Sequence, residues 1–260
     1  MAYLFTHEDQ KERERLAAIE ATADPFTIER FESIGVQPGW HCLEIGAGGG
    51  SMTEWLCDRV GTEGRVVATD LQTKFLEAID RPNLDVIEHN ISEMDIDFGS
   101  FDLIYSRKVL EHMSDPVTPL QRMHAALKEG GYLYIEDTDM NALMMVAEKY
   151  KTPFEKGYAA FLETMAASGF QPEFGRALGD QLRALGLQNV RVKGATNEWS
   201  GANEQSAGKI FRMTFERMKV GIVEKGILTE EEADEYLQII QAPDFHAVTS
   251  VHFTAFGQKV

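Results

Sequence analysis

Two acidic residues and a run of glycines stand where this sequence could bind a charged ligand. In the stretch CLEIGAGGGSMTEWL (residues 42–56), Gly46, Gly48 and Gly50 alternate with small residues, directly after an apolar run that contains Glu44. Glycines leave the main chain open to close approach, which favours a ligand held against backbone groups. Because Glu44 would repel a pyrophosphate, the pattern favours a ligand that carries an ammonium or sulfonium group.

Further polar positions extend this candidate site. Asp70 ends the next predicted strand, about 20 residues on, where an acid accepts hydrogen bonds from ribose hydroxyls. His89, Asn90 and Ile91 follow the third predicted strand, where an amide oxygen can accept from an adenine amino group and Ile91 can pack on the ring. A cleft that tolerates a cation and binds ribose and adenine fits S-adenosylmethionine.

The same glycine turn is also compatible with three alternatives to a methyl-transfer site. Dinucleotide-binding enzymes use G-x-G-x-x-G, whereas the spacing here is G-x-G-x-G and Ser51 follows Gly50. An NAD-dependent oxidoreductase on a similar sheet therefore stays as an alternative, with Ser51 and Glu44 against it. A turn needed only for packing is also compatible with the pattern, as is a non-catalytic module that binds S-adenosylmethionine.

The elements that position these residues alternate along the first half of the chain. A charged helix over 8–22 and a second helix, opened by Pro25 and ending near Gly35, come first. The predicted strands are 40–45, 65–70, 84–89, 101–106 and 132–137, and the helices between them are 51–60, 72–79 and 115–128. This alternation with short connections predicts a parallel sheet with helices on both faces.

After Asp137 the pattern becomes helical. Apolar residues recur every three or four positions over 140–187, and Thr229 with Glu232 forms a capping box for a late helix. The remaining elements predicted here are a strand near 189–194, a helix over 203–224 and a strand over 247–259. We expect N-terminal helices (1–35, a lid), a cofactor-binding core (36–139), a helical insertion or substrate cap (140–187) and elements that complete the sheet (188–260).

Four segments in order resemble the motifs of one family. LEIGAGGGSMTEWL, VVATDLQ, IEHNISEMDIDFGSFDLIYSRKVLEHMSDP and LKEGGYLYIED look like the successive motifs of class I S-adenosylmethionine-dependent methyltransferases. They are most similar to the ubiquinone and menaquinone biosynthesis group, which includes many small-molecule and natural-product enzymes. The resemblance covers 36–137 and thins over 138–260. It implies an α/β, Rossmann-like fold: a doubly wound, mostly parallel seven-stranded sheet with a helical cap.

The resemblance also implies roles for individual residues. Gly46, Ala47 and Gly48 would face the methionine part of the cofactor. Glu44 would lie near the cofactor's amino group, and Ser106 would present its backbone to the same part.

The nucleoside would be held by the next positions of the motifs. Asp70 would bind the ribose hydroxyls, and Leu71 would pack on the adenine. Asn90 and Ile91 would frame the adenine edge, although the family usually has an aspartate in place of Asn90. Tyr3 would close over the cofactor as an N-terminal lid, unless it belongs to a fraying terminus.

The chemistry needs few catalytic groups. Methyl transfer from a sulfonium is an in-line displacement, to which alignment contributes up to roughly 7–11 kcal/mol. His112 is the candidate base, with a structural role in its loop as the alternative. For Arg107 we favour a structural ion pair, for example with Asp102, over substrate binding. Glu136 and Asp137 would face the acceptor or cap the following helix.

The second half and the composition limit the partners. Methionines over 140–218 predict either a lid over a flat, apolar acceptor or ordinary core, and His246 and His252 are assigned to surface or core. The net charge of −17 argues against a nucleic-acid partner.

Targeting signals and metal sites are not indicated by the sequence. No segment approaches the roughly 20 apolar residues of a membrane span, and the N-terminus turns charged too soon for a signal peptide. Cys42 and Cys57 lack metal-ligand spacing and are predicted as buried thiols. We expect a cytoplasmic enzyme without metal that acts on a small, apolar or aromatic molecule. The acceptor, the methylated atom (O, N or C) and the oligomeric state, a homodimer included, stay open.

Overall fold

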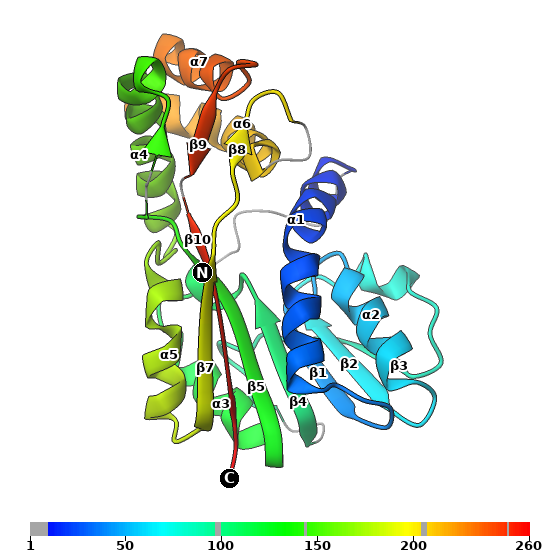
Figure 1. The fold of residues 1–260 in the computed structure, drawn as a ribbon. Helices are drawn as coiled ribbons and strands as arrows, with labels where there is room; N and C mark the ends of the chain where they lie inside the picture. Colours follow the sequence, from blue (N-terminus) through cyan, green and yellow to red (C-terminus); the bar gives the residue numbers. More distant parts are fainter. Residues whose placement is uncertain (1–9, 97–99, 143–144, 204–206, 249) are drawn as a thin grey trace.

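The fold is built on one large sheet. The computed structural model describes residues 10–96, 100–142, 145–203, 207–248 and 250–260. Within these residues the sheet has seven strands in the order β3-β2-β1-β4-β5-β10-β7 (Figure 1). The strands are β1 (His41–Ile45), β2 (Arg65–Asp70), β3 (Leu84–Glu88), β4 (Phe101–Arg107), β5 (Leu127–Asp139), β7 (Gln188–Ala195) and β10 (Val251–Gln258). The first five are mutually parallel and β10 is antiparallel to both neighbours, which confirms the predicted doubly wound, mostly parallel sheet.

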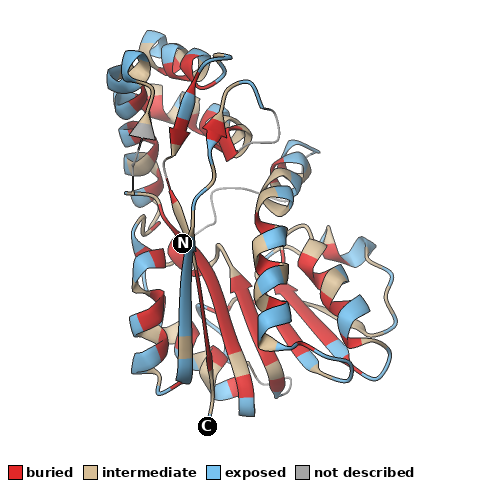
Figure 2. Cartoon of the chain, viewed as in Figure 1, coloured by how far each residue is buried: buried red, intermediate tan, exposed pale blue. Residues whose placement is uncertain are grey.

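Helices cover both faces of this sheet. One face is covered by α1 (Gln10–Ile34) and α2 (Ser51–Val60), the other by α3 (Val117–Ala126) and α5 (Phe174–Ala184). Successive residues of a strand point to opposite faces, so Leu103 and Tyr105 pack toward α1 and α2 while Ile104 packs toward α3 and α5. The central strands are therefore buried on both sides, whereas the edge strand β7 is largely exposed (Figure 2).

Three of the predicted helices differ from the structure. Residues 10–34 form one continuous helix with Pro25 inside it, instead of two helices. A proline removes one helical hydrogen bond, but α1 contacts both the sheet and α6, so packing along its length offsets that loss. Over the predicted helix 72–79 the structure has a single 3₁₀ turn at Leu76–Ala78.

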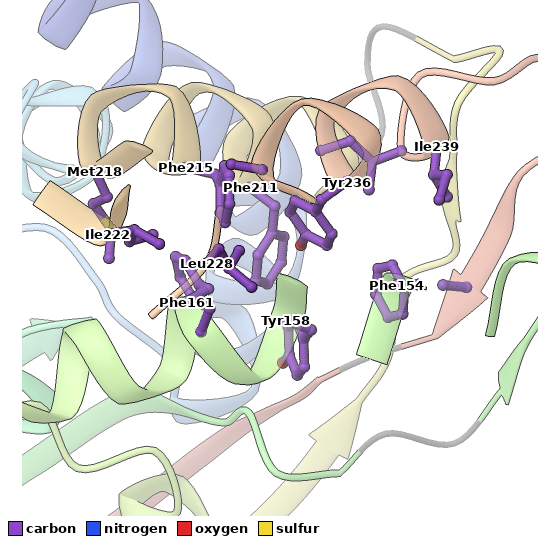
Figure 3. Packing of buried hydrophobic residues seen from close by; sticks show 14 of the residues in the cluster. Phe154, Tyr158, Phe161, Phe211, Phe215, Met218, Ile222, Leu228, Tyr236 and Ile239 are labelled. Carbon is purple, nitrogen blue, oxygen red and sulfur yellow. The ribbon is translucent and has the colours of Figure 1, made fainter. Parts of the chain in front are cut away.

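A second core forms beyond the end of the sheet. It consists of α4 (Lys151–Ala166), α6 (Ala207–Glu224), α7 (Glu230–Ile239) and a small sheet of β6 (Met145–Val146), β9 (His246–Val248) and β8 (Trp199–Ser200), which together we call the cap. Rings from α4 point toward rings from α6 and α7 (Figure 3). Trp199 stacks on Phe211, with ring centroids 4.6 Å apart, and Phe154 meets Trp199 edge-on at 5.4 Å.

The packing divides residues 140–187 between these two cores. α4 packs with α6 and α7 in the cap, whereas α5 packs against β5, β7 and β10. The apolar stripe of α5 indicates a buried face but not the partner that covers it. We therefore propose that α5 belongs with the sheet and that α6 and α7 belong with the cap.

Candidate active site

A cavity of about 280 Å³ lies at the carboxyl edge of the sheet, beneath the cap and beside the N-terminal half of α1. Open α/β sheets bind their ligands at this edge, where the order of the strands reverses. Here the chain returns from β3 to place β4 beside β1. The cavity brings together the loops after β1, β2, β3 and β4 with side chains from α1 and the cap.

The loop after β1 shows why glycine is needed there. Gly46 has a φ of 70°, and a Cβ on it would overlap the side chain of Val109. A Cβ on Gly49 would overlap Glu20, which lies on α1. The positive φ and the overlap with Val109 therefore require glycine at position 46, whereas the contact at Gly49 is with the flexible end of Glu20. Gly46, Ala47 and Gly48 line the cavity.

Asp70 is fixed by the same loop. Its Oδ2 accepts a hydrogen bond from the Gly48 N–H (2.9 Å), and its Oδ1 accepts one from the Gln72 N–H (3.1 Å). A carboxylate has about four acceptor positions, so the remaining two can accept from ribose hydroxyls. Leu71 lines the cavity and is 45% exposed, so it offers apolar surface to a flat ring.

Glu44 lies at the base of the cavity and is buried. Its Oε2 accepts a hydrogen bond from the Thr53 hydroxyl at 2.6 Å. Burial raises the pKa of Glu44 to about 7, and the Thr53 hydrogen bond lowers it only in part. A neighbouring cation favours the charged form of such a carboxyl, so Glu44 is suited to the amino group of a ligand.

The loop after β3 is held by its own hydrogen bonds. Asn90 and Ile91 both line the cavity. The Asn90 Oδ1 accepts from the Ser92 N–H at 3.1 Å, which leaves one lone pair of that oxygen for an adenine amino group. Ile91 is buried and also packs in the core beneath the sheet.

Of the described residues predicted to bind the cofactor, Ser106 does not line the cavity. Ser106 is buried within β4, where it pairs with Ile45 and Ile135, and the cavity is lined by the next residues, 107–109. Tyr3 lies outside the described residues.

Arg107 ties α1 to the sheet. It forms an ion pair with Asp24 (2.8 Å) and donates to the Thr27 hydroxyl (3.0 Å), which in turn donates to Glu136 (2.8 Å). Its partner is therefore Asp24 and not Asp102, which binds Lys128. Sequence spacing could not identify this pair, because Asp24 lies 83 positions before Arg107 and between the two helices predicted over 8–22 and from Pro25.

Glu136 and Asp137 are buried near the end of β5 and do not line the cavity. Neither Glu136 nor Asp137 caps a helix, because β5 continues to Asp139, so that alternative is wrong. Asp137 Oδ1 accepts from the Val109 N–H at 3.2 Å. Burial, together with the neighbouring Glu111, raises the pKa of Asp137 well above its usual range.

His112 reaches the cavity from a 3₁₀ turn, Leu110–His112. Its ring packs on Phe170 with centroids 5.1 Å apart, and its Nε2 lies 3.9 Å from the Glu111 Oε1. Burial lowers the pKa of His112 to about 4. The imidazole is therefore neutral near pH 7 and can accept a proton, although it is a weak base.

Further residues that line the cavity were not singled out as site residues from the sequence. They come mainly from α1, the loop after β4, the ends of β5 and β10 and the cap, and include Arg15, Leu16, Ile19, Glu20, Lys108, Glu111, Thr138, Met140, Phe161, Met165, Ile210, Phe211, Ser250 and His252. Lys108 and Glu111 lie within the motif segment that contains His112. Their place in this segment was the one feature of the sequence that could have indicated a role in the site.

The described residues show neither a metal site nor a membrane-spanning helix. No group of three or more histidine, cysteine, aspartate or glutamate side chains in the described ranges could hold a metal ion. None of the helices described combines the length and apolar character that crossing a bilayer requires.

Comparisons with known proteins agree with this geometry. The profile of a methyltransferase domain family matches residues 43–135. A ubiquinone/menaquinone biosynthesis C-methyltransferase from Pseudoalteromonas translucida is 29% identical over 41% of this chain and 46% of its own length. A ubiquinone biosynthesis O-methyltransferase from Ralstonia nicotianae is 25% identical over 66% of this chain and 72% of its own.

A solved structure has the same fold. Phosphoethanolamine N-methyltransferase 2 from Haemonchus contortus, in complex with S-adenosyl-L-methionine, matches with a TM-score of 0.55 and 17% identity, over 95% of this chain and 52% of that chain. At this identity the likeness shows the fold.

The matches leave part of the relatives uncovered. The alignments span 39% and 46% of the length of two of the curated relatives, from Streptomyces fradiae and Pseudoalteromonas translucida. The family predicted from the motifs is confirmed, and the oxidoreductase alternative is not favoured. Residues 43–135 match the methyltransferase domain family, and the chain resembles the ubiquinone and menaquinone biosynthesis methyltransferases.

Proposed function

We propose that this protein transfers a methyl group from S-adenosylmethionine to a small molecule with an apolar or aromatic body. One observation carries the proposal: a single cavity joins the residues suited to the cofactor with an apolar wall from the cap. The cofactor half contributes Glu44 and Asp70, and the cap contributes Phe161, Met165 and Phe211. A module that only stored the cofactor would not require the second half.

The cofactor, when bound, supplies a methyl group already activated by its sulfonium. The protein's own residues then have to bind, align and exclude water. We assign the ribose to Asp70, the adenine to Leu71, Asn90 and Ile91, and the amino group to Glu44. His112 is placed to accept a proton from an acceptor hydroxyl or amine, and an acceptor carbon already activated as an anion would need alignment alone.

The acceptor class follows from the wall opposite the cofactor residues. Thioether and aromatic side chains adapt to flat apolar shapes, and Met140 and Met165 lie beside Phe161 and Phe211 there. Relatives named for ubiquinone and menaquinone biosynthesis support an aromatic ring as the acceptor. They comprise both a C- and an O-methyltransferase, so the methylated atom is a matter for experiment.

The site of action is part of the same proposal. Cys42 and Cys57 are buried free thiols, which supports a reducing, cytoplasmic location.

Calorimetry with S-adenosylhomocysteine, followed by methyl-transfer assays, tests the proposal. We expect the purified protein to bind S-adenosylhomocysteine and not NADH. With labelled S-adenosylmethionine, a panel of phenols, aromatic amines and hydroquinones should yield at least one methylated product. No binding of S-adenosylhomocysteine would contradict the cofactor assignment, and binding without turnover of any acceptor would favour a non-catalytic module.

A further inference from the structure

The two ends of the cavity differ in the strands that form them. Asp70 and Leu71 follow β2, while Lys108 follows β4 and Thr138 and His252 belong to β5 and β10. In the sheet, β5 and β10 lie two and three positions from β1, on the side away from β2. Lys108, Thr138 and His252 therefore lie at the end that faces the acceptor and not the nucleoside.

Lys108 is held in an unusual backbone conformation at this end. Its φ is 55°, in the left-handed region that residues other than glycine rarely adopt. Its N–H donates to the Glu136 carbonyl at 2.7 Å, which fixes the residue after the end of β4. Strained positions of this kind cluster at functional sites, and here the strain accompanies a lysine that lines the cavity.

The charge of Lys108 is not neutralised by a carboxylate. Its Nζ lies 3.3 Å from the Nδ1 of His252, and no ion pair of Lys108 occurs among the residues that the structure describes. The two arginines that line the cavity differ, because Arg15 is paired with Glu12 and Arg107 with Asp24. Lys108 therefore presents an ammonium group to the acceptor end of the cavity.

Glu136 and Asp137 are near enough to interact with the charge of Lys108, but neither forms an ion pair with it. Burial, and next the charge of Lys108 itself, lowers the pKa of His252 well below its usual value, so this ring is neutral. Glu111 also lines the cavity, but its Oε2 accepts hydrogen bonds from the Thr138 N–H (2.6 Å) and hydroxyl. Ser250 lines the same end, and its hydroxyl can donate to a bound oxygen.

We propose that the acceptor carries an anionic oxygen, as a carboxylate or a phenolate, which binds the Lys108 Nζ while the apolar body lies against Met165 and Phe211. This inference rests on the proposed methyl transfer and specifies its substrate class. It makes Lys108 a residue that determines specificity: a neutral analogue of the same shape would leave the ammonium group buried under the acceptor without an anionic partner.

Binding of matched compounds to the protein saturated with S-adenosylhomocysteine tests the inference. One arm compares hydroxybenzoates, hydroxycinnamates and hydroxynaphthoates with their primary amides, and the other compares acidic nitrophenols with the matching nitroanisoles. We expect the anionic member of at least one series to bind about tenfold more tightly or better, as for a hydrogen bond to a charged group. The arm that shows the preference distinguishes a carboxylate from a phenolate.

Three variants assign that preference to Lys108. Lys108→Met should abolish it and Lys108→Arg should retain it, while Lys225→Met, at an exposed lysine, should leave it unchanged. All three should bind S-adenosylhomocysteine like the wild type. That binding separates the inference from the proposed function, which fails when S-adenosylhomocysteine does not bind.

Several results would overturn the inference. These are equal or tighter binding of the neutral members to the wild type, a preference that persists in Lys108→Met, and no binding of either member of any pair. Because the wild-type comparison alone decides the first and third, the inference stays testable even if Lys108→Met does not fold.

Discussion

The cofactor end and the acceptor end of the cavity are built in different ways. The cofactor end comes from residues 44–91, where three strands and their loops follow one another closely in the sequence. Much of it is main chain, as at Gly48, whose N–H holds Asp70. The acceptor end is made of side chains from α1, the loop after β4, β10 and the cap. A local motif can specify the first end, whereas the second exists only when distant elements pack together.

A buried ion cluster joins the two ends. Glu12 on α1 pairs with Arg15 (2.7 Å) on the same helix and with Arg217 (2.7 Å) on α6 of the cap. Farther along α1, Leu16 and Glu20 lie against the glycine loop. α1 therefore contacts the cofactor loop and the cap at once, so binding at one end can affect the other through this helix.

The largest expected effect comes from a substitution in the core of the cap, which tests whether the two ends of the cavity are built separately. Phe154 is fully buried among Tyr158, Trp199 and Phe245 and does not line the cavity. Phe154→Ala should lower the free energy of unfolding by about 3–5 kcal/mol, because it leaves a large void. Denaturant unfolding measures this loss, and Val220→Ala on the exposed surface of α6 is the control.

The same variant tests whether the ends are independent. If they are built separately, Phe154→Ala should retain affinity for S-adenosylhomocysteine within about threefold, since about 1 kcal/mol changes affinity roughly fivefold. A loss of affinity as large as the loss of stability would show that the cap supports the cofactor end.

Asp70 provides the next largest effect, at the cofactor end. Asp70→Ala should weaken binding of S-adenosylhomocysteine up to about 100-fold, because hydrogen bonds to a charged group contribute roughly 1.5–3 kcal/mol. Asp70→Asn keeps the shape and one acceptor oxygen and should lose less. The 2′,3′-dideoxy analogue should bind wild type and Asp70→Ala equally weakly, and unchanged affinity of Asp70→Ala for the natural compound would refute the ribose assignment.

The sheet could be predicted because its signals are local. Strands such as 65–70 are apolar runs bounded by turns, and a parallel sheet buried on both faces needs no other pattern. The helix through Pro25 could not be predicted, since the partners that stabilise it, the sheet and α6, are distant in the sequence. The packing partners of α5 and α6 could not be predicted either, because an apolar stripe shows which face is buried but not which element covers it.

The candidate site divides in the same way. Glu44, Asp70 and Asn90 line the cavity, since each comes directly after or within a predicted strand, and their roles toward the cofactor stay predictions. The high pKa of Glu44 was not foreseen, since it depends on burial that only the packed structure shows. Lys108 was missed because its role depends on the absence of an ion pair and on the nearness of His252, 144 positions away.

The raised pKa of Glu44 predicts that the stability of the protein and the binding at the cofactor end both depend on pH. Without ligand, the pKa of Glu44 is about 7 in the folded protein, compared with 4.5 for an unperturbed glutamate. At a pH between these two values, the folded state therefore keeps a proton on Glu44 that the unfolded state has lost. The free energy of unfolding should therefore fall as the pH rises from 4.5 through about 7. Thermal unfolding of wild type and Glu44→Gln measures this, and the variant should show a smaller fall, because the raised pKa values of Glu136 and Asp137 contribute a fall of the same sign.

Binding should show the opposite dependence on pH. A ligand's ammonium group favours ionised Glu44, so the affinity of the wild type for S-adenosylhomocysteine should rise by up to about tenfold between roughly pH 6 and pH 8. Glu44→Gln should remove this rise, whereas Glu54→Gln, on the exposed side of α2, should keep it. A rise that persists in Glu44→Gln would assign the proton to another group.

The smallest effect is expected at His112, where the two ends meet. Its pKa of about 4 makes the imidazole a weak base, so His112→Ala should lower kcat only about threefold to tenfold, below the usual contribution of a matched base. Affinity for S-adenosylhomocysteine should not change, and His246→Ala, at an exposed histidine of β9, should leave kcat unaltered. Because His112 is neutral throughout roughly pH 6 to 9, the wild-type kcat should show no titration from it in that range. A fully active variant would mean that the acceptor end works by alignment alone, and a loss of cofactor affinity would place His112 with the cofactor end instead.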